Sequence, residues 1–366
     1  MNIGIGGAGS KLASLSSDGS CTIVNVSELE LHKIEASSKI LAVTHSSCGQ
    51  FKGSGKNPEV GKIAFSSISS ELKSLIKSNI IFTSTGGGTG NGITSVLLND
   101  IAELSSVEAQ EKSMFVFVLP YVNRESAEYV DNTITFLGSP VSKAIDSGNT
   151  GNMVFFSNKL KFEGKFPERE YNQMMVDSLN NFLAIPVKGE MYSLLDGHID
   201  FEDFNLYKSK PYFNHFCYFP FNLEEPFDVQ LKSNYNNLLL PPEETIEAMF
   251  LLELPDPSMT PAFYDVVEFF AKENIAPSYG VIHNPDLEVP HITVSILYSR
   301  KPKELVADFK QVSESYTRNR IKKSINQHVV LQNHSLDKLN EARKIMEEDD
   351  SSGQDIVGLL KRLGKL

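Results

Sequence analysis

The sequence predicts an α/β protein built on a parallel sheet that helices cover. Over residues 1–160, short β-rich runs alternate with helical patterns, and Gly-rich or polar loops separate them. This alternation is typical of parallel strands joined by crossover helices. A second strand-and-helix unit follows, and the chain closes with a charged helical stretch. We therefore expect a Rossmann-like parallel sheet domain, a central helix, a smaller α+β domain and a helical C-terminal tail.

The strands of the first domain are expected where short hydrophobic runs are bounded by turn residues. These runs cover residues 1–5, 21–26, 40–43, 80–85, 114–119 and 153–156. Apolar residues at helical spacing predict helices around 68–76 and 93–101. The carboxyl ends of such parallel strands form one edge of the sheet, and ligands bind there.

The second part begins after a long helix predicted at 168–183, which ends before Pro186. A further helix is expected at 261–273, with Pro261 in its first turn. The strands expected in this part cover 246–254, 278–283 and 291–297. The predicted division of the chain is therefore 1–185, 186–300 and 301–366.

Composition restricts the class of protein. With 366 residues, 41% of them apolar, the chain can bury one large core or two ordinary ones. No run reaches the roughly 18 apolar residues of a membrane-spanning helix, and the first residues lack a basic flank, so we expect a cytoplasmic protein. The three cysteines show no CxxC spacing, which favours buried thiols over disulfides or zinc. A net charge of −12 argues against direct nucleic-acid binding.

A glycine-rich loop follows the first strand. The sequence GIGGAG at 4–9 fits GxGxxG, whose glycines let the backbone turn tightly and approach a phosphate at a helix N-terminus. The same motif would serve a nicotinamide-binding Rossmann domain, for which Glu28 lies near the expected ribose-binding acid. An ordinary strand-to-helix turn is the third possibility. The predicted phosphate-binding residues of this loop are Gly6, Gly7, Ala8, Gly9 and Ser10.

A second glycine loop, TGGGTGNG at 85–92, follows the strand at 80–83 and leads into a helix. Its small residues let N–H groups turn inward as an anion nest, to which a threonine hydroxyl can add. Two such loops on neighbouring strands suit a triphosphate. No GxxxxGK[ST] loop occurs, which disfavours a P-loop NTPase. The predicted nucleotide-binding residues of this loop are Gly86, Gly87, Gly88, Thr89, Gly90 and Asn91.

These motifs, in this order, resemble the tubulin/FtsZ superfamily. GGGTGNG is similar to the signature GGGTG(T/S)G and departs from it only at Asn91. GSGKNPEVGK at 53–62 looks like the FtsZ loop GAGGNPEVGR, and FSNKL at 156–160 resembles its PNDKL loop. IGIGGAG at 3–9 and the strand at 23–26 also resemble FtsZ segments. The organisation is closest to the small tubulins of bacterial plasmids and phages (TubZ/PhuZ-like).

The resemblance implies a GTPase that binds GTP, GDP and Mg²⁺ and assembles into a homopolymer. Residues 1–185 would form the GTP-binding domain and 186–300 the activation domain. The resemblance also implies that an aromatic residue and an asparagine of the central helix contact the base, and Tyr171 and Asn172 supply these types. Asp177 is the other candidate, because a carboxylate can accept from both guanine N1–H and the exocyclic amine. No side chain is predicted as a metal ligand. The further nucleotide-binding residues implied are Asn25, Gly53, Glu125, Asn158 and Tyr171.

Two carboxylates, Asp200 and Asp203, lie in a loop at 196–204 that looks like the FtsZ pattern NxDFxD. Their local sequence fits helix capping as well as catalysis. The resemblance implies that this loop reaches the nucleotide of the neighbouring subunit, where carboxylates can orient a water toward the γ-phosphate. We therefore predict that Asp200 and Asp203 are catalytic and act on another copy's GTP.

The C-terminal segment 355–366 places apolar residues at helical spacing beside basic ones. It can pack on its own domain, dock on a neighbour, bind a DNA-binding adaptor or lie on a membrane. The preferred function is a dynamic GTP-dependent filament that segregates or positions plasmid or phage DNA. The alternatives are an FtsZ-like division ring, an NAD(P)-dependent oxidoreductase, and a non-catalytic protein that caps filaments.

Overall fold

The computed structural model describes residues 1–46, 49–50 and 52–299, with 306–307, 309–311 and 314. Residues 1–306 form one compact unit and 307–366 another. Both predicted domains, 1–185 and 186–300, lie within the first unit, so the boundary between them stays a prediction. The amphipathic segment predicted at 355–366 lies outside the described residues.

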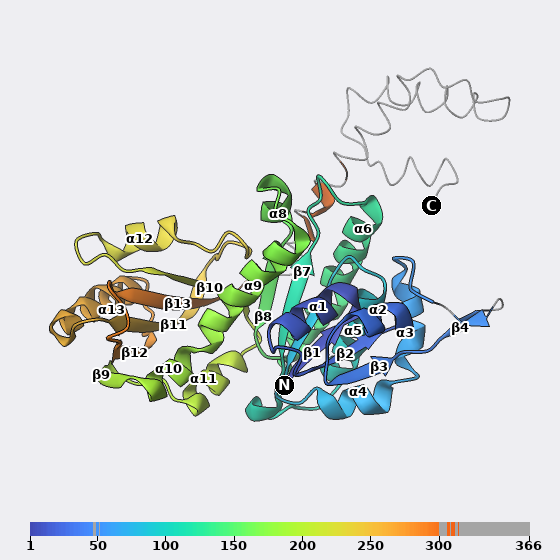
Figure 1. Ribbon diagram of the computed structural model, residues 1–366, viewed down its shortest axis with the longest axis horizontal. Coiled ribbons are helices and arrows are strands. Elements are labelled where there is room, and N and C mark those ends of the chain that lie inside the picture. Colours follow the sequence, from blue (N-terminus) through green and yellow to red (C-terminus); the bar gives the residue numbers. More distant parts are fainter. Residues whose placement is uncertain (47–48, 51, 300–305, 308, 312–313, 315–366) are drawn as a thin grey trace, which may run out of the picture. The chain divides into compact units, whose positions relative to one another are not determined.

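One sheet of 11 strands runs through the described part of the first unit, in the order β3-β2-β1-β6-β7-β8-β10-β13-β11-β12-β9 (Figure 1). From β3 to β8 all neighbouring strands are parallel. This arrangement confirms the predicted α/β class with its parallel sheet. The strands of this half are β1 (Asn2–Ile5), β2 (Cys21–Asn25), β3 (Ser38–Leu41), β6 (Ile80–Ser84), β7 (Met114–Leu119) and β8 (Met153–Ser157).

The second half of the sheet is mixed. β13 is antiparallel to both β10 and β11, β11 and β12 are parallel, and β9 closes the sheet antiparallel to β12. Three of these strands agree with the runs expected at 246–254, 278–283 and 291–297, whereas β9 and β10 were not predicted. The strands are β9 (Ser193–Gly197), β10 (Phe213–Pro220), β11 (Thr245–Leu254), β12 (Ser278–His283) and β13 (His291–Tyr298). A separate hairpin pairs β4 (His45–Ser46) with β5 (Gly49–Gln50).

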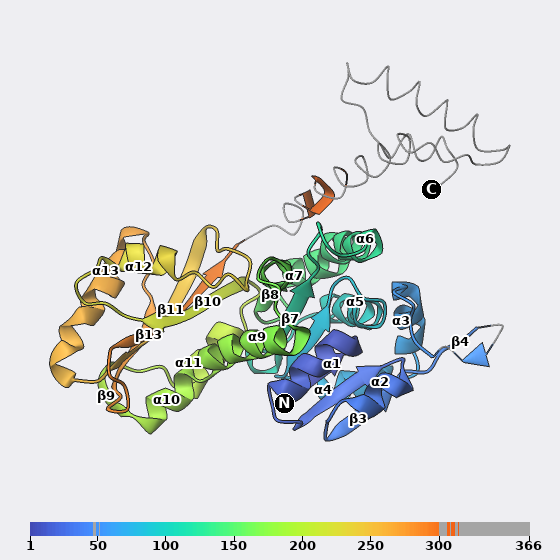
Figure 2. The same cartoon turned by 45° about the horizontal axis from the view of Figure 1, so that its top comes forward.

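Helices connect the parallel strands as predicted. α1 packs on β1, β2 and β6, and α5 packs against α3, α6 and α7 (Figure 2). The helices of this half are α1 (Gly6–Leu15), α2 (Glu28–Lys33), α3 (Pro58–Phe65), α4 (Ser69–Leu75), α5 (Thr89–Ala102), α6 (Ala127–Phe136), α7 (Ser142–Ser147) and α8 (Lys159–Glu163). A short 3₁₀ helix, Ala109–Glu111, and a π-helical segment between α6 and α7, Leu137–Val141, complete this half.

The predicted central helix is confirmed at 168–183 as α9 (Glu168–Leu183). Its buried face, which includes Met175, Leu179 and Phe182, joins one apolar core with residues of β7, β11 and β13. A second core lies wholly in the other half, where α12 and α13 cover the sheet. The remaining helices are α10 (Ile185–Met191), α11 (Phe201–Lys208), α12 (Phe227–Ser233) and α13 (Phe263–Lys272).

The helix expected at 261–273 begins later than predicted. Pro261 lies in a 3₁₀ turn, Pro257–Ala262, and the α-helix starts at Phe263. The turn is fixed by Asp256, whose carboxylate accepts from the Ser258 N–H at 2.8 Å. This local hydrogen bond competes with the α-helical start that the proline alone suggested.

Two helices touch backbone to backbone. A Cβ on Gly92 of α5 would lie 2.8 Å from Gly61 Cα on α3, and one on Gly61 would lie 2.8 Å from the Gly88 carbonyl oxygen. Only glycine permits this approach. The contact holds together the two loops that precede these helices, residues 52–57 and 85–88.

Two other expectations concern cysteines and membranes. Cys21 and Cys217 are buried free thiols, as predicted, while Cys48 lies outside the described residues. Among the helices that the structure describes, none combines the length and the apolar character needed to cross a membrane.

Candidate functional site

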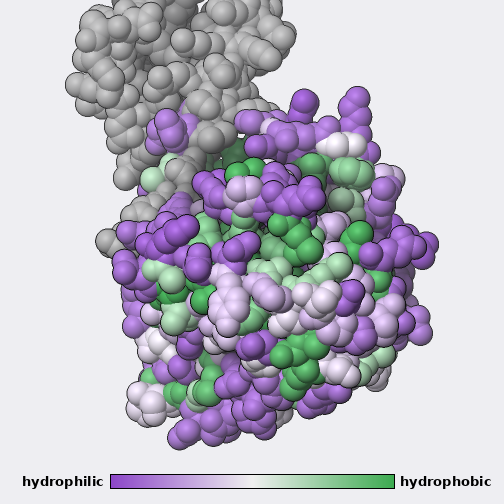
Figure 3. All heavy atoms as spheres, turned by 90° about the vertical axis from the view of Figure 1, so that its left-hand side faces the viewer, coloured by the Kyte–Doolittle hydropathy of each residue, from purple (hydrophilic) through white to green (hydrophobic). Residues whose placement is uncertain are grey.

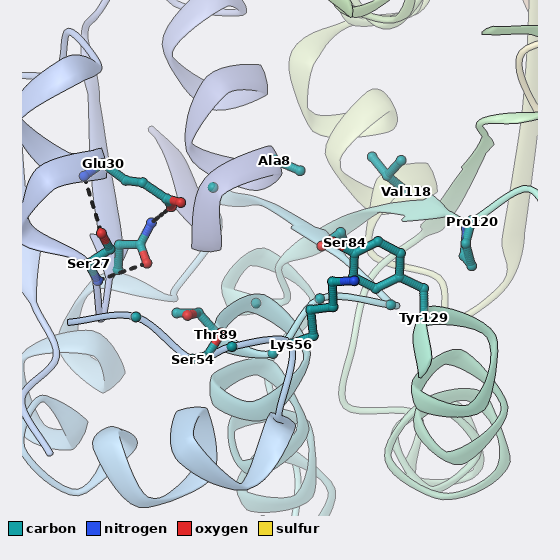
Figure 4. A pocket seen from close by; sticks show the side chains of 18 of the residues that line it. Ala8, Ser27, Glu30, Ser54, Lys56, Ser84, Thr89, Val118, Pro120 and Tyr129 are labelled. Carbon is teal, nitrogen blue, oxygen red and sulfur yellow. Dashed lines mark hydrogen bonds between the residues drawn. The ribbon is translucent and has the colours of Figure 1, made fainter. Parts of the chain in front are cut away.

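A pocket of about 500 Å³ lies at the carboxyl ends of the parallel strands (Figure 4). The two glycine loops, the loop before α3 and the first turns of α6 and α9 form its wall, so it lies at the predicted edge. The predicted site residues that line it are Gly7, Ala8, Asn25, Gly53, Gly86, Gly87, Gly88, Thr89, Gly90, Glu125 and Asn158. The lining residues that sequence reasoning missed are Ser27, Glu30, Lys52, Ser54, Gly55, Lys56, Ser84, Val118, Pro120, Tyr129, Lys161 and Glu168.

The first glycine loop opens α1 directly. Gly6 has φ +75°, and a Cβ there would lie 2.7 Å from the Gly90 N atom, so both conformation and space require glycine. No side chain caps α1, which leaves the first N–H groups at Gly7 and Ala8 available to an anion. Gly6, Gly9 and Ser10 do not line the pocket. Gly9 packs against the backbone of β6 and Ser10 donates to the Gly4 carbonyl, so both residues shape the loop.

Gly86, Gly87 and Gly88 have no positive φ, so the backbone conformation of the second glycine loop does not require glycine. The loop needs small residues because the surrounding space is narrow. A Cβ on Gly88 would lie 2.7 Å from the N atom of Asn57 and 2.8 Å from its carbonyl oxygen. One on Gly87 would meet only the rotatable Ser84 hydroxyl, at 2.9 Å. The loop before α3 thus leaves no room for a side chain at position 88. No side chain caps α5, so its N-terminus also faces the pocket uncapped.

Buried asparagines tie these loops together. Asn91, predicted to bind nucleotide, is buried away from the pocket and donates to the carbonyls of Thr85 and Asn132. Asn132 of α6 donates to the Lys56 carbonyl at 2.9 Å and to the Gly86 carbonyl at 2.8 Å. Sequence reasoning missed Asn132, since only the fold brings it between the two loops. Asn91 thus ties the second glycine loop to α6 and is not among the residues that line the pocket.

At one end of the pocket, Asn25 holds a carboxylate in place. Its amide donates to Glu30 Oε2 at 2.6 Å, and its oxygen accepts from the Ser27 N–H at 3.2 Å. Glu30 lies beside the first glycine loop, where a Cβ on Gly7 would meet Glu30 Oε2 at 2.9 Å (Figure 4). A carboxylate so close to the phosphate-type loop can take a cation.

At the other end, two carboxylates face the pocket. Glu125 accepts from the Tyr121 N–H at 2.6 Å and from the Asn158 amide at 3.1 Å. Glu168, at the first turn of α9, is 2.6 Å from Lys11 Nζ. The hydrogen bond from Lys11 holds the pKa of Glu168 below its usual value, which keeps this carboxylate ionised.

The three residues of α9 that were predicted to contact the base do not line the pocket. Tyr171 is fully buried, donates to the Ser157 carbonyl at 2.5 Å, and has a pKa raised to about 12 by burial. Asn172 does not line the pocket, and Asp177 is exposed and accepts from Gln173 at 2.8 Å. The helix therefore presents Glu168, not these three residues, to the pocket. Its rotation about its axis is set by the core residues that it buries.

The chain was compared with known proteins by sequence and by structure. By sequence, no family model and no curated protein matches the chain. Solved structures match most of it. TubZ from Bacillus thuringiensis serovar israelensis, in a GTPγS-form protofilament, has a TM-score of 0.67 at 15% identity over 87% of this chain and 93% of its own. CetZ2 from Haloferax volcanii, in a GTPγS-bound protofilament, has 0.64 at 16% over 86% and 98%.

An FtsZ dimer from M. jannaschii also matches, with a TM-score of 0.57 at 20% identity over 81% of this chain and 86% of its own. The chain has the tubulin/FtsZ fold. Structures of TubZ, CetZ and FtsZ all match at similar TM-scores, so the fold does not assign the chain to the plasmid and phage tubulins or to either of the other two groups.

In this tubulin/FtsZ fold, the two predicted catalytic carboxylates lie outside the pocket of their own chain. Asp200 caps α11, and its Oδ1 accepts from the Asp203 N–H at 2.7 Å. Asp203 is exposed. The capping alternative is thus present in the geometry, and any catalytic role has to be exerted on another molecule.

The surface around Asp200 carries exposed apolar side chains. They are Val187, Met191, Leu194, Phe201 and Leu206, from α10, β9 and α11. Figure 3 shows the side of the molecule that lies at the left in Figure 1, at the end of the second half of the sheet. On this side, apolar residues lie among polar ones without forming one broad patch. Such mixed surfaces are typical of transient protein–protein interfaces.

Proposed function

We propose that the protein is a GTPase that assembles into filaments, with GTP bound between the glycine loops of one copy and the Asp200 loop of the next. The observation that carries this proposal is the pocket itself. Two uncapped helix N-termini, those of α1 and α5, converge on it from neighbouring strands. Each contributes about half a positive charge, which suits a polyphosphate. The GTPγS-bound protofilaments of TubZ and CetZ2 support the same assignment.

The base would lie at the end formed by α6, α8 and α9. An ionised Glu168 can accept from guanine N1–H and from the exocyclic amine, while adenine offers no such pair of donors on that edge. Glu125 and Asn158, which bond to each other, would face the ribose. In this proposal Glu168 replaces Asn172 and Asp177 as the base-reading residue.

Mg²⁺ would be held mainly by the phosphates and by Glu30. The fit is good because Mg²⁺ binds through one or two carboxylates and substrate phosphates, and Glu30 lies against the Gly7 backbone. The ion would offset phosphate charge there. Asn25 orients the Glu30 carboxylate through its amide hydrogen bond.

Hydrolysis would be completed by another copy. Phosphoryl transfer needs mainly a positioned water and a complementary field, which two carboxylates can supply. Asp200 and Asp203 do not line the pocket of their own chain. They would therefore act on the GTP bound to the adjacent subunit of the filament. The proposed cellular role is movement or positioning of plasmid or phage DNA in the cytoplasm, through an adaptor at the C-terminal tail.

Nucleotide choice is the first test. Titration calorimetry should show binding of GTP and GDP and none of NADH. Glu168→Gln should weaken GTP binding by about tenfold, because a charge-assisted hydrogen bond is lost, and should leave ATP binding as weak as before. Glu163→Gln, a change on α8 outside the pocket lining, is the matched control. Binding of NADH in place of GTP would identify an oxidoreductase instead.

Assembly is the second test. Light scattering should rise on addition of GTP, fall as GTP is consumed, and stay flat with GDP. Phosphate release per molecule should increase with protein concentration, because a single copy lacks half of the catalytic site. A protein that binds GTP and never scatters would be a filament-capping protein and would contradict the proposal.

A further inference from the structure

The chain between the central helix and Asp200 runs through α10 and β9 (Figure 1). Its last part is enclosed on two sides. A Cβ on Gly189 of α10 would lie 3.5 Å from the Ile199 carbonyl oxygen, and one on Gly280 of β12 would lie 3.8 Å from the Ile199 N atom. Ile199 itself is 2% exposed. The residue directly before Asp200 is therefore packed between α10 and β12, so a shift of α10 is passed on to Asp200.

The C-terminal half of α10 has little apolar contact with the rest of the protein. Val187 and Met191 are 50% and 71% exposed. The buried apolar side chains of the helix, Ile185 and Pro186, lie in its first turn. Gly189 is buried as well but has no side chain to pack. Apolar packing therefore fixes the beginning of α10, and its end depends on other interactions.

One of these interactions is a largely buried ion pair. Lys188 Nζ of α10 lies 2.5 Å from Glu253 Oε1 of β11, and the two side chains are 21% and 1% exposed. The other carboxylate oxygen accepts from the Asn284 amide at 2.9 Å. The ammonium group lies 4.9 Å from the centre of the Tyr218 ring. Each charge thus has partners on the sheet or on the loop after β12, and together they attach α10 to this half of the protein.

Stability alone does not account for such a pair. Desolvation of buried charges offsets most of their attraction, and an apolar pair of similar volume is often as stable or more stable. An ion pair adds geometry, since its hydrogen bonds have a short length and a preferred direction, whereas apolar contacts are non-directional. On α10 this geometry fixes Lys188, the direct neighbour of Gly189, which touches the loop before Asp200.

We propose that Lys188 and Glu253 are positioning residues for hydrolysis, and that their ion pair holds α10 where the Asp200 loop reaches the nucleotide of the adjacent subunit. The proposal rests on the function proposed above. Neither residue lines the pocket of its own chain, so the pair leaves nucleotide binding to the glycine loops. It acts only on the half of the site that each copy supplies to another.

The test removes both charges at once. Lys188→Met/Glu253→Gln keeps the side-chain volumes, and the glutamine oxygen can still accept from Asn284. Because no charge stays buried without a partner, the melting temperature should remain close to the wild-type value. GTP binding below the assembly concentration should be unchanged. Phosphate release per assembled subunit should fall about tenfold or more, since a displacement of about 1 Å at a reacting group can cost about a hundredfold.

Two further variants show whether the effect is specific. Lys188→Arg keeps the charge and should hydrolyse GTP within about threefold of the wild-type rate. Lys210→Met/Glu247→Gln is the matched control, because it removes an ion pair of the same length, 2.5 Å, that also ends on β11 but starts after α11 rather than on α10. It should hydrolyse GTP at the wild-type rate. Normal hydrolysis in Lys188→Met/Glu253→Gln, or an equal loss in the control, would overturn the positioning role.

Hydrogen exchange of the unassembled proteins tests the same role without the reaction. The Asp203 N–H bonds to Asp200 Oδ1 at 2.7 Å. It should exchange about tenfold faster in Lys188→Met/Glu253→Gln, because a loop that is held less firmly opens more often, and at the wild-type rate in the control. Unchanged exchange in both would contradict the positioning role. A wild-type protein that releases no phosphate from GTP would instead refute the proposed function, so the two failures are distinguishable.

Discussion

Replacing Asp200 with alanine is expected to slow GTP hydrolysis by about a hundredfold or more, the usual effect of losing a group that positions a reacting water. GTP binding should be unchanged, because Asp200 does not line the pocket of its own chain. Filaments should still form and should persist. Phosphate release and pelleting, measured across a concentration series, report the two properties separately.

Capping by Asp200 complicates this variant, since losing the bond to the Asp203 N–H should lower the free energy of unfolding by about 1 kcal/mol. Asp200→Asn separates the two roles. Asparagine caps helices as well as aspartate does, but it lacks the charge. If Asp200→Asn hydrolyses GTP at the wild-type rate per folded molecule, Asp200 is only a cap.

Mixed filaments locate the action of the carboxylate. An Asp200→Ala subunit would place its defect on its neighbour's GTP, so adding it should slow the turnover of wild-type subunits. A mixture whose activity is the sum of its separate components, or a wild type whose activity is linear in concentration, would rule out a shared site.

Gly88→Ala is expected to weaken GTP binding by about tenfold to a hundredfold, the equivalent of the 1–3 kcal/mol that overpacking typically costs. The new Cβ would press on the Asn57 backbone, so the loop before α3 has to move out of the pocket. Gly87→Ala should have a smaller effect, because the Ser84 hydroxyl can rotate away.

A matched control for this variant is Gly138→Ala. Its Cβ would meet only Val306 Cγ2, at an ordinary 3.7 Å, and it lies outside the pocket lining. Melting temperatures of both variants show whether folding is affected. Unchanged GTP affinity in Gly88→Ala would mean that this loop does not hold phosphate.

Much of the fold was predictable because its signals are local. A hydrophobic strand, a glycine loop and a helix in direct succession gave β1 with α1 and β6 with α5. β10 was missed because its polar residues interrupt the hydrophobic run. Asn214 donates to Asn152 of the loop before β8, and His215 bonds to the Leu240 carbonyl. These partners are distant in sequence, so no local pattern reveals that the polar groups are satisfied and buried.

The pocket was predictable only in part for a related reason. A run of glycines identifies a phosphate-type loop from the sequence alone. A polar residue on a helix contributes to the pocket only if the helix is oriented so that the residue faces the pocket. On α9 the sequence offered Tyr171, Asn172 and Asp177, but packing in the core turned the helix so that Glu168 lines the pocket. The rotation of a helix is a tertiary property, and Asn132 on α6 was missed for the same reason.

The glycine contact between α3 and α5 has a mechanical consequence. Side chains between helices can change rotamer and absorb small displacements, but close-packed backbones such as those at Gly61 and Gly92 cannot. A ligand that draws the loop before α3 inward should therefore shift both helices as one body. Ile63 of α3 is 60% exposed at the surface of that body. The occupancy of the pocket would thus be transmitted, as a rigid displacement, to a point where another molecule can sense it.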